Sequence, residues 1–373
     1  MHKKLWLFNK KLYNFNNFIN NHPGGKWVIE ESKGHDITYL VQNNHNWTKE
    51  QAVNRLKKYE YKTNTNYNTI LEWDIELDSI HDALKKKGFD HTNLKTPLWG
   101  WLYYLIYGIT YSMYFYNWIV NGNYGIIVGL FGVIFGLIQH EASHSALSNN
   151  PWINYIFRYT LIPWASPENW YKRHSINHHQ YTNTILDDDY ITDNNYFVRH
   201  HKSTHWYYPQ RIQTLTITLY SFFLTFFFSI GYVSIIQLLI ISSHYYLHNN
   251  IVSALSPFMT FGFIFIIISQ LNHIQNKTTP KQILYAPTNF VKHQIACCYD
   301  YSHGNHIITI ITSFLNYQTY HHLFPNISHF HFLILKPIID EILLNHGYEI
   351  NHDSSFKNTI KKYFIHLNNL SKK

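Results

Sequence analysis

Cysteine is almost absent from this sequence. Its only two cysteines among 373 residues, Cys297 and Cys298, are adjacent. A disulfide between neighbouring residues is strained, so we expect two free thiols and no disulfide framework. Residues 1–13 also lack the apolar segment of a secretory signal peptide, so none is predicted.

Charged residues are scarce as well. Lys, Arg, Asp and Glu make up 14% of the chain and aromatic residues 18%, with a formal net charge of +8. A positive balance can indicate a nucleic-acid partner, but this composition fits a membrane protein better. We therefore expect no nucleic-acid binding. The mean hydropathy of -0.25 averages polar ends with an apolar middle.

Two long segments contain no Lys, Arg, Asp or Glu. Residues 98–120 are long enough for one transmembrane helix, and a second span begins near residue 124 and runs into His140. The second charge-free segment predicts a membrane-surface or re-entrant helix at 212–229, then spans at 231–247 and 251–271.

The positions of Lys and Arg predict the topology. They lie before the first span, between residues 158 and 211, and from Lys277 onward, whereas the turns at 121–123 and 248–250 carry none. The positive-inside rule then places both termini in the cytosol, with about four spans. We expect a multi-pass protein of the endoplasmic reticulum.

Histidine, in contrast, is abundant, with 27 residues. Three groups, or boxes, lie at or just beyond the edges of apolar stretches: His140 and His144; His174, His178 and His179; His321 and His322. His273 follows the last predicted span. Imidazole is a good ligand for iron, zinc or copper, so these boxes predict a metal centre facing buried hydrocarbon.

Chance patterns need consideration, because at this histidine frequency a given three-histidine pattern occurs on the order of 0.1 times per chain. Three other groups are therefore regarded as coincidental: His200, His201 and His205; His303 and His306; His329 and His331. Asp187, Asp188 and Asp189 either orient ligand histidines or belong to a solvated loop.

Residues 1–62 are predicted to form a small soluble domain. Residues 6–8 and 12–18 alternate enough for two short strands around a turn at Asn9-Lys10. His22 opens a His-Pro-Gly-Gly sequence that permits a tight, rigid turn, and His45 lies further along. Two such histidines can hold a haem iron from both sides; a surface loop with an unrelated histidine is the alternative.

This region resembles a cytochrome b5 domain. The matching positions are Trp6, Leu12 to Asn14, Phe18, His22 to Gly25, Gly34, Asp36, Thr38 and His45. The resemblance implies a small α+β domain that binds haem b through His22 and His45 and transfers single electrons.

The predicted domain limits follow. They are 1–62 for the b5-like domain, 63–97 for a linker and helix, 98–345 for an all-α membrane domain and 346–373 for a cytosolic tail. Residues 63–69 are polar and low in complexity, as in a linker. Residues 71–88 predict an amphipathic helix facing either an anionic membrane surface or solvent.

The membrane part resembles front-end fatty-acid desaturases fused to cytochrome b5. The match rests on the two earlier boxes and on Gln318, which precedes His321 and His322. The resemblance implies two non-haem irons, with these site residues: His140, His144, His174, His178, His179, His273, Gln318, His321 and His322. One departure is Thr319-Tyr320, where the family usually has Ile-Glu.

The resemblance also implies an O₂-dependent reaction that introduces a cis double bond into the substrate, a fatty-acyl lipid or acyl-CoA. The enzyme would also contact membrane lipid. Two electrons would pass from an NADH–cytochrome b5 reductase through the b5-like domain. The alternatives are a sphingolipid long-chain-base desaturase, a di-iron lipid hydroxylase and a membrane-anchored haem electron carrier. The double-bond position and acyl length are left open.

Overall fold

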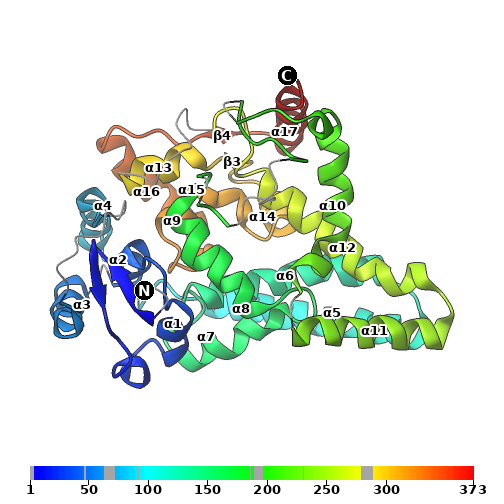
Figure 1. Cartoon of the computed structure of the whole chain (residues 1–373), viewed down its shortest axis with the longest axis horizontal. Helices are drawn as coiled ribbons and strands as arrows, with labels where there is room; N and C mark the ends of the chain where they lie inside the picture. Colours follow the sequence, from blue (N-terminus) through cyan, green and yellow to red (C-terminus); the bar gives the residue numbers. More distant parts are fainter. Residues whose placement is uncertain are drawn as a thin grey trace.

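The molecule has two parts, a small N-terminal domain and a larger helical region (Figure 1). The computed structural model describes residues 4–45, 48–62, 72–90, 92–184, 186–188, 196–202, 204–229, 231–278 and 289–373. The predicted linker at 63–69 lies outside these residues. The two-part architecture agrees with the sequence prediction of a b5-like domain followed by a helical domain.

The N-terminal domain is built on a short hairpin. Strands β1 (Trp6–Phe8) and β2 (Lys11–Tyr13) pair antiparallel, with Trp6 opposite Tyr13. The strand predicted from residue 12 to 18 is shorter, because the chain turns where Phe18 N donates to Phe15 O. The helical elements of this domain are η2 (Ile19–Asn21), α1 (Lys26–Glu31), α2 (Thr38–His45), α3 (Lys49–Leu56) and η4 (Lys57–Tyr59).

Helix α4 (Ile75–Lys86) connects the two parts and begins later than the predicted residue 71. Asp74 caps it, accepting hydrogen bonds from the backbone N–H groups of residues 76 and 77. Leu77, Ile80 and Leu84 are fully buried in a core formed with the C-terminal half of the chain. Most of the apolar face of this helix therefore packs on protein, whereas Ile75 at its first position is exposed.

The region predicted to lie in the membrane contains five apolar helices: α5 (Leu98–Asn121), α6 (Gly125–Ser143), α10 (Gln213–Phe228), α11 (Tyr232–His248) and α12 (Ile251–Gln270). By length and composition, α6 and α12 could each cross a membrane. Residues 208–228 and α11 form a pair bent by 113°, a broken span or a re-entrant segment. The described residues thus hold two or three candidate spans, and the predicted four are not confirmed.

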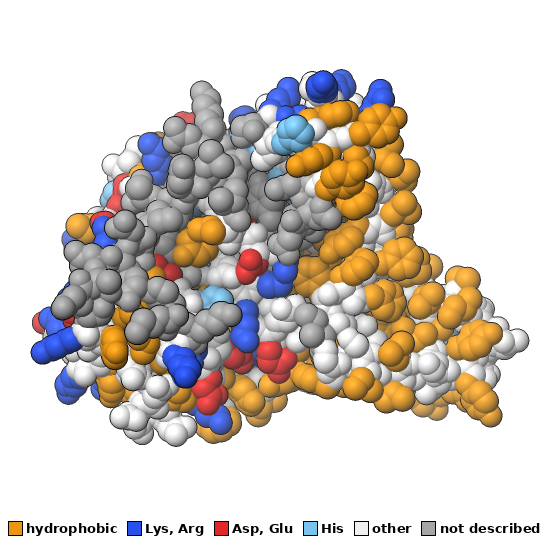
Figure 2. Space-filling view, in the orientation of Figure 1, with side chains coloured by type: hydrophobic (Ala, Val, Ile, Leu, Met, Phe, Trp, Pro, Cys, Tyr) orange, Lys and Arg blue, Asp and Glu red, His pale blue; other side chains and the backbone are white. Residues whose placement is uncertain are grey.

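The exposed surface supports membrane insertion. Figure 2 shows hydrophobic side chains gathered over the right-hand part of the molecule, whereas Lys, Arg, Asp and Glu gather at the left and along the top. The exposed apolar residues of this belt include Leu105, Ile109, Phe223, Leu238 and Leu239. An exposed apolar surface of this extent is typical of contact with lipid.

Short helices and turns cover one end of the apolar helices. They comprise α7 (Pro151–Phe157), η5 (Arg158–Leu161), α8 (Pro167–Trp170), the π-helix η6 (Tyr171–His178), α9 (His179–Tyr181), η7 (Tyr208–Ile212), α13 (Phe290–Cys297), α14 (His306–Ile311), η8 (Leu315–Tyr317), α15 (Gln318–Leu323), η9 (His329–His331) and α16 (Phe332–Asn345). This layer carries most of the predicted site residues.

The segment predicted as a tail is folded onto the domain. Strand β4 (His352–Asp353) pairs in parallel with β3 (Asp300–Tyr301), and helix α17 (Phe356–Leu370) buries Tyr363 and Leu367 in a core shared with α10 and α12. The C-terminal residues therefore belong to the folded helical domain.

Candidate metal centre and haem cavity

The three histidine boxes meet in the interior of the helical domain. His140 lies in the last turn of α6 and His144 directly follows this helix. Their side chains join those of His174, His179 and His321 in one buried cluster, in which one ligand nitrogen from each lies within 4.8 Å of the others. We call this five-histidine group the first cluster.

The ring nitrogens of the first cluster are close enough to share an ion. The Nε2 atoms of His140 and His174 are 2.9 Å apart, those of His174 and His179 are 3.3 Å apart, and those of His179 and His321 are 3.1 Å apart. Two nitrogens bound at right angles, about 2.1 Å from one metal ion, would be separated by about 3 Å. The spacing therefore fits a bare metal ion.

A second cluster adjoins the first. It consists of His178, His273 and His322, with the Nε2 atoms of His178 and His273 3.3 Å apart. The rings of His179 and His322 are stacked with centroids 4.3 Å apart, so the two clusters are in direct contact. Eight predicted histidine ligands are thus brought together in two groups.

Second-cluster histidines are held by hydrogen bonds on their other ring nitrogen. His178 Nδ1 lies 2.9 Å and 3.0 Å from the two carboxylate oxygens of Asp187. His273 Nδ1 lies 3.1 Å from Cys297 O, and His322 Nδ1 lies 2.8 Å from Gln294 Oε1. These contacts orient each Nε2 toward the cluster, as in carboxylate–histidine–metal arrangements.

The three aspartates singled out in the sequence have different positions in the structure. Asp187 contacts a predicted ligand, which supports the orienting role. Asp188 instead accepts a hydrogen bond from Asn177 Nδ2 and takes no place in either cluster. Asp189 lies outside the described residues.

Burial keeps the clustered imidazoles neutral. Desolvation holds the pKa values of His174, His179, His321 and His322 well below their usual range, and the neighbouring histidines lower them further. Desolvation likewise lowers the pKa of His273 to about 3. Neutral imidazole is the form that binds metals, and the buried His144 and His322 each leave Nε2 without a hydrogen-bond partner among the described residues. The donor set therefore fits two metal ions.

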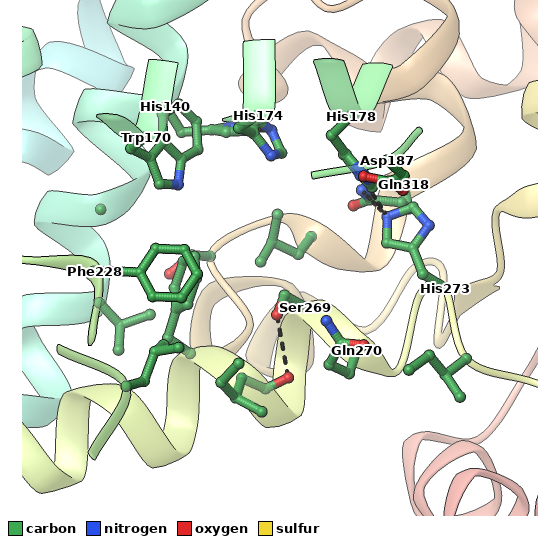
Figure 3. A pocket seen from close by; sticks show the side chains of 18 of the residues that line it. His140, Trp170, His174, His178, Asp187, Phe228, Ser269, Gln270, His273 and Gln318 are labelled. Atoms are coloured by element: carbon green, nitrogen blue, oxygen red, sulfur yellow. Dashed lines mark hydrogen bonds and ion pairs between the residues drawn. The ribbon is translucent and has the colours of Figure 1, made fainter. Parts of the chain in front are cut away.

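Gln318 lies beside the second cluster. Its Nε2 is 3.0 Å from His273 Nε2 (Figure 3). Its Oε1 accepts a hydrogen bond of 3.0 Å from Asn272 Nδ2. In this orientation the amide N–H group, and not the carbonyl oxygen, faces the cluster. An N–H group can donate to a bound water but cannot act as a metal ligand.

The residues at the unusual Thr319-Tyr320 positions face away from both clusters. Thr319 donates to Asp300 Oδ1 through its backbone N and its hydroxyl, at 2.8 Å and 2.9 Å. Tyr320 donates to Asp340 Oδ1 at 2.5 Å. This departure from the family pattern therefore affects the hydrogen bonds that hold α15 in place. The histidine ligands themselves are unchanged.

The first cluster has a neighbour that the sequence prediction set aside. The ring centroid of His329 is 4.8 Å from that of His321 and 5.1 Å from that of His140. His329 Nδ1 is 3.1 Å from the buried carboxylate of Glu141, and its buried Nε2 has no hydrogen-bond partner among the described residues. Glu141 also accepts hydrogen bonds from Thr96, Tyr104 and Ser328.

Neither His329 nor Glu141 stood out in the sequence. His329 shares its spacing with coincidental pairs, and Glu141 lies between two box histidines where only the fold reveals its burial. The signal that could have drawn attention to Glu141 is its position at the end of an apolar helix, where an acidic residue needs a partner.

A narrow cavity of about 90 Å³ runs along both clusters between α6, α10 and α12. Figure 3 shows His140, Trp170 and His174 on one side, with His178, Asp187, His273 and Gln318 grouped on the other. Phe228 and other apolar side chains form the remaining wall. The arrangement brings a hydrocarbon-lined space against a predicted metal centre.

A second, larger cavity, of about 540 Å³, lies between the N-terminal domain and the helical domain. His22 and His45 face one another across it, with ring centroids 6.1 Å apart. An iron about 2 Å from one nitrogen of each ring would separate the ring centres by about 6 Å. Both Nδ1 atoms lie against backbone carbonyls, at 3.2 Å from Gly25 O and 2.9 Å from Val41 O, and these contacts fix the orientation of the two rings.

Steric constraints explain why glycine occupies the two positions after Pro23. A Cβ atom at Gly24 would lie 2.9 Å from His22 Cε1, and Gly25 has a φ of +96°. Side chains at these positions would displace the imidazole or strain the backbone. The His-Pro-Gly-Gly sequence thus holds His22 in the orientation that a haem would need.

The N-terminal domain docks directly on the helical domain. Arg158, whose side chain is 0% exposed, pairs with the carboxylate of Glu31 at 2.8 Å and 3.1 Å. Its guanidinium lies 4.1 Å from the ring centre of Trp27 and 4.8 Å from that of Tyr171. The larger cavity is consequently lined by both domains, including Ser143 and Ser145, which flank His144.

Comparisons with known proteins agree with this geometry. The family model described as fatty acid desaturase matches residues 116–354, and the model described as cytochrome b5-like heme/steroid binding domain matches residues 1–87. No solved structure matches the chain.

Three relatives match over most of their length. They are a probable Delta(5) fatty acid desaturase C of Dictyostelium discoideum (25% identical, covering 96% of this chain and 90% of the relative), an acyl-lipid (8-3)-desaturase B of the same organism (26%, 97% and 90%) and an acyl-lipid (8-3)-desaturase of Mortierella alpina (26%, 88% and 85%). None of the three is named for a sphingoid base or a hydroxylation. The chain belongs to the fatty acid desaturase family, as a front-end fatty-acyl desaturase with an N-terminal cytochrome b5 domain.

Proposed function

We propose that the two histidine clusters hold the two non-haem irons of this desaturase. The proposal depends on one observation, the convergence of eight buried histidines at nitrogen spacings of about 3 Å. His140, His144, His174, His179 and His321 would bind one iron. His178, His273 and His322 would bind the other, and the amide N–H group of Gln318 would face this iron site as a hydrogen-bond donor.

When bound, the irons would supply the O₂-derived oxidant that an unactivated methylene C–H bond requires. The protein holds the ligands and excludes water. Asp187 and Gln294 fix the orientation of their histidines, and Phe228 with other apolar residues lines the space beside the clusters. An acyl chain in this space would present a methylene pair to the centre with little competing solvent.

Purified protein tests this assignment. We expect about two non-haem irons per chain in addition to one haem. His178→Ala and His321→Ala, one from each cluster, should abolish product and lower non-haem iron. Full activity and full iron content in either variant would overturn the ligand assignment.

We further propose that the N-terminal domain binds haem b through His22 and His45 and receives electrons from an NADH–cytochrome b5 reductase. Support comes from the facing imidazoles and from the cavity lined by both domains. Held by His22 and His45, a haem would supply one-electron transfer. Anaerobic mixing with NADH and reductase should reduce the haem, and an unchanged spectrum would contradict this route.

For the topology, we propose four spans in the endoplasmic reticulum membrane with both termini in the cytosol. The absence of Lys and Arg from residues 121–123 and 248–250 supports this arrangement. Glycosylation tags at these two turns should be modified in the lumen, and tags at the termini should not. An unmodified tag at 248–250 would require a different number of spans.

For the substrate, we propose a polyunsaturated fatty-acyl lipid, because the relatives are named Δ5 or acyl-lipid (8-3) desaturases. Expression in yeast fed with individual polyunsaturated acids, followed by chromatography of the lipids, should reveal a new double bond on the carboxyl side of an existing one. A new double bond on the methyl side would contradict the proposal.

A further inference from the structure

Helix α6 carries a row of glycines that approach neighbouring elements. A Cβ atom would lie 2.0 Å from Ser256 Oγ at Gly125, 2.4 Å from Pro257 O at Gly129 and 2.6 Å from the Trp164 ring at Gly132. Contacts this short exclude any side chain. These three glycines therefore permit close packing, mainly between α6 and α12.

Gly136 continues the row but meets no such obstacle. The nearest atoms to its Cβ position are two ring carbons of Phe261 at 4.0 Å, although the residue is buried. Gly136 lines the narrow cavity and lies one helical turn before His140, on the same face of α6. The absence of a side chain at Gly136 therefore leaves open space in the cavity. It does not serve close packing between helices, as it does at the other three glycines.

The cavity differs in polarity along its length. Asp187, His200 and Gln318 contribute polar groups to its lining, whereas Val133, Leu224 and Phe228 contribute hydrocarbon. A polar lipid headgroup would be costly to bury against hydrocarbon. An acyl chain is thus expected to enter from the polar side and to extend its methyl end along α6.

We propose that Gly136 determines how much acyl chain, on the methyl side of the reacting carbons, this desaturase accepts. The inference rests on the proposed function, in which the cavity beside the clusters holds the substrate. The cavity is only about 90 Å³, so a leucine side chain at this position would take up most of it. The nearest atoms to the Cβ position belong to Phe261, and none of them to a histidine ligand.

The test compares Gly136→Ala and Gly136→Leu with the unaltered full-length enzyme. Each would be supplied with acids that share their double-bond positions but differ in methyl-side length. We expect Gly136→Leu to lower conversion of the longest acid relative to the shortest by about tenfold or more, and Gly136→Ala to shift it in the same direction by less. Non-haem iron and haem would be measured for every variant.

Gly108→Leu in α5 is the matched control. A Cβ there meets nothing within 4 Å, and Gly108 does not line the cavity. We expect its length profile to match that of the unaltered enzyme. If Gly136→Leu retains iron and an unchanged profile, the inference is wrong.

If Gly136→Leu loses iron or fails to accumulate, the profile of Gly136→Ala decides, because one methyl group meets only the 4.0 Å contact. An unchanged profile there overturns the inference. Failure of the unaltered enzyme to desaturate any acid would instead refute the proposed function, so the two failures are distinguishable.

Discussion

The two predicted iron-binding regions use the same side chain at different spacings. In the N-terminal domain two imidazoles face one another with ring centroids 6.1 Å apart, across a cavity of about 540 Å³. In the helical domain, neighbouring Nε2 atoms lie 2.9 to 3.3 Å apart. The first spacing suits an iron carried in a flat macrocycle, and the second suits bare ions.

The difference also concerns the supporting structure. The N-terminal pair is held by backbone carbonyls on nearby turns, so a short sequence can specify it. The clusters depend on helices from across the chain and on side chains such as Asp187, Glu141 and Gln294. The two regions should therefore respond independently to mutation.

The largest expected effect is that a mutation in either site abolishes product formation but leaves the cofactor of the other site in place. His22→Ala should lose the haem absorption band and most product while keeping non-haem iron. His321→Ala should keep a reducible haem but form no product. Optical spectra, iron analysis and lipid chromatography measure these three properties.

This experiment belongs in a host without free cytochrome b5, which could replace the missing donor. If His22→Ala makes product there at the original rate, the N-terminal haem is not the required donor. The fused domain would then need another role, such as docking.

The next effect distinguishes the two clusters. Gln318→Ala should reduce turnover by about 10- to 100-fold, the range for residues that contact metal ligands, because His273 loses its neighbour. Its iron content should fall much less, since an amide N–H group is not a ligand. Iron lost in proportion to activity would identify Gln318 as a ligand and would contradict the amide orientation seen here.

A smaller effect is expected at the first cluster from His329→Gln. The change removes a ring packed against His140 and His321 and should weaken iron retention about tenfold against a chelator. His331→Gln is the matched control, because His331 Nε2 contacts Lys95 O and His331 belongs to neither cluster. Equal iron retention in the two variants would show that His329 does not contribute to iron binding and only packs against the cluster.

The smallest effect concerns a buried histidine outside both regions. Burial lowers the pKa of His81, on α4, to about 3. Between pH 6.5 and 3 the unfolded chain binds a proton there that the folded chain does not, so the free energy of unfolding falls as the pH falls. His81 alone should lower the free energy of unfolding by about 2 kcal/mol at pH 5, relative to neutral pH.

His81→Leu should therefore flatten the decline in thermal stability between pH 7 and pH 5, as followed by melting in detergent. Metal binding cannot explain such a change, because His81 belongs to neither cluster. An unaltered slope would mean that the histidine is solvated in the folded protein.

Much of the site could be predicted because its chemistry is local in sequence. Box spacing places His140 and His144 one turn apart on a helix, and His22 is fixed by the turn that follows it. His273 lay at the end of a predicted span and does join a cluster. These features depend on helical periodicity and glycine sterics, which a single sequence records.

The remainder depends on contacts between distant segments. His329 was set aside because its spacing resembles a chance pattern, yet its position follows from Glu141, 188 residues earlier. Helix α4 was predicted as amphipathic, but its sequence could not distinguish protein from membrane or solvent as the partner of the apolar face. The number of spans also stays open, because the predicted break between 229 and 231 does not decide whether α10 and α11 form one bent span or a re-entrant segment.

The Arg158–Glu31 contact limits how freely the domains can be exchanged between enzymes. Removing one partner of a buried ion pair commonly costs 3–5 kcal/mol, because the remaining charge has no compensation. A chimera that carries a foreign b5 domain without a carboxylate at this position would leave Arg158 in that condition. Domain grafting in this enzyme therefore requires transfer of the contact surface together with the haem ligands.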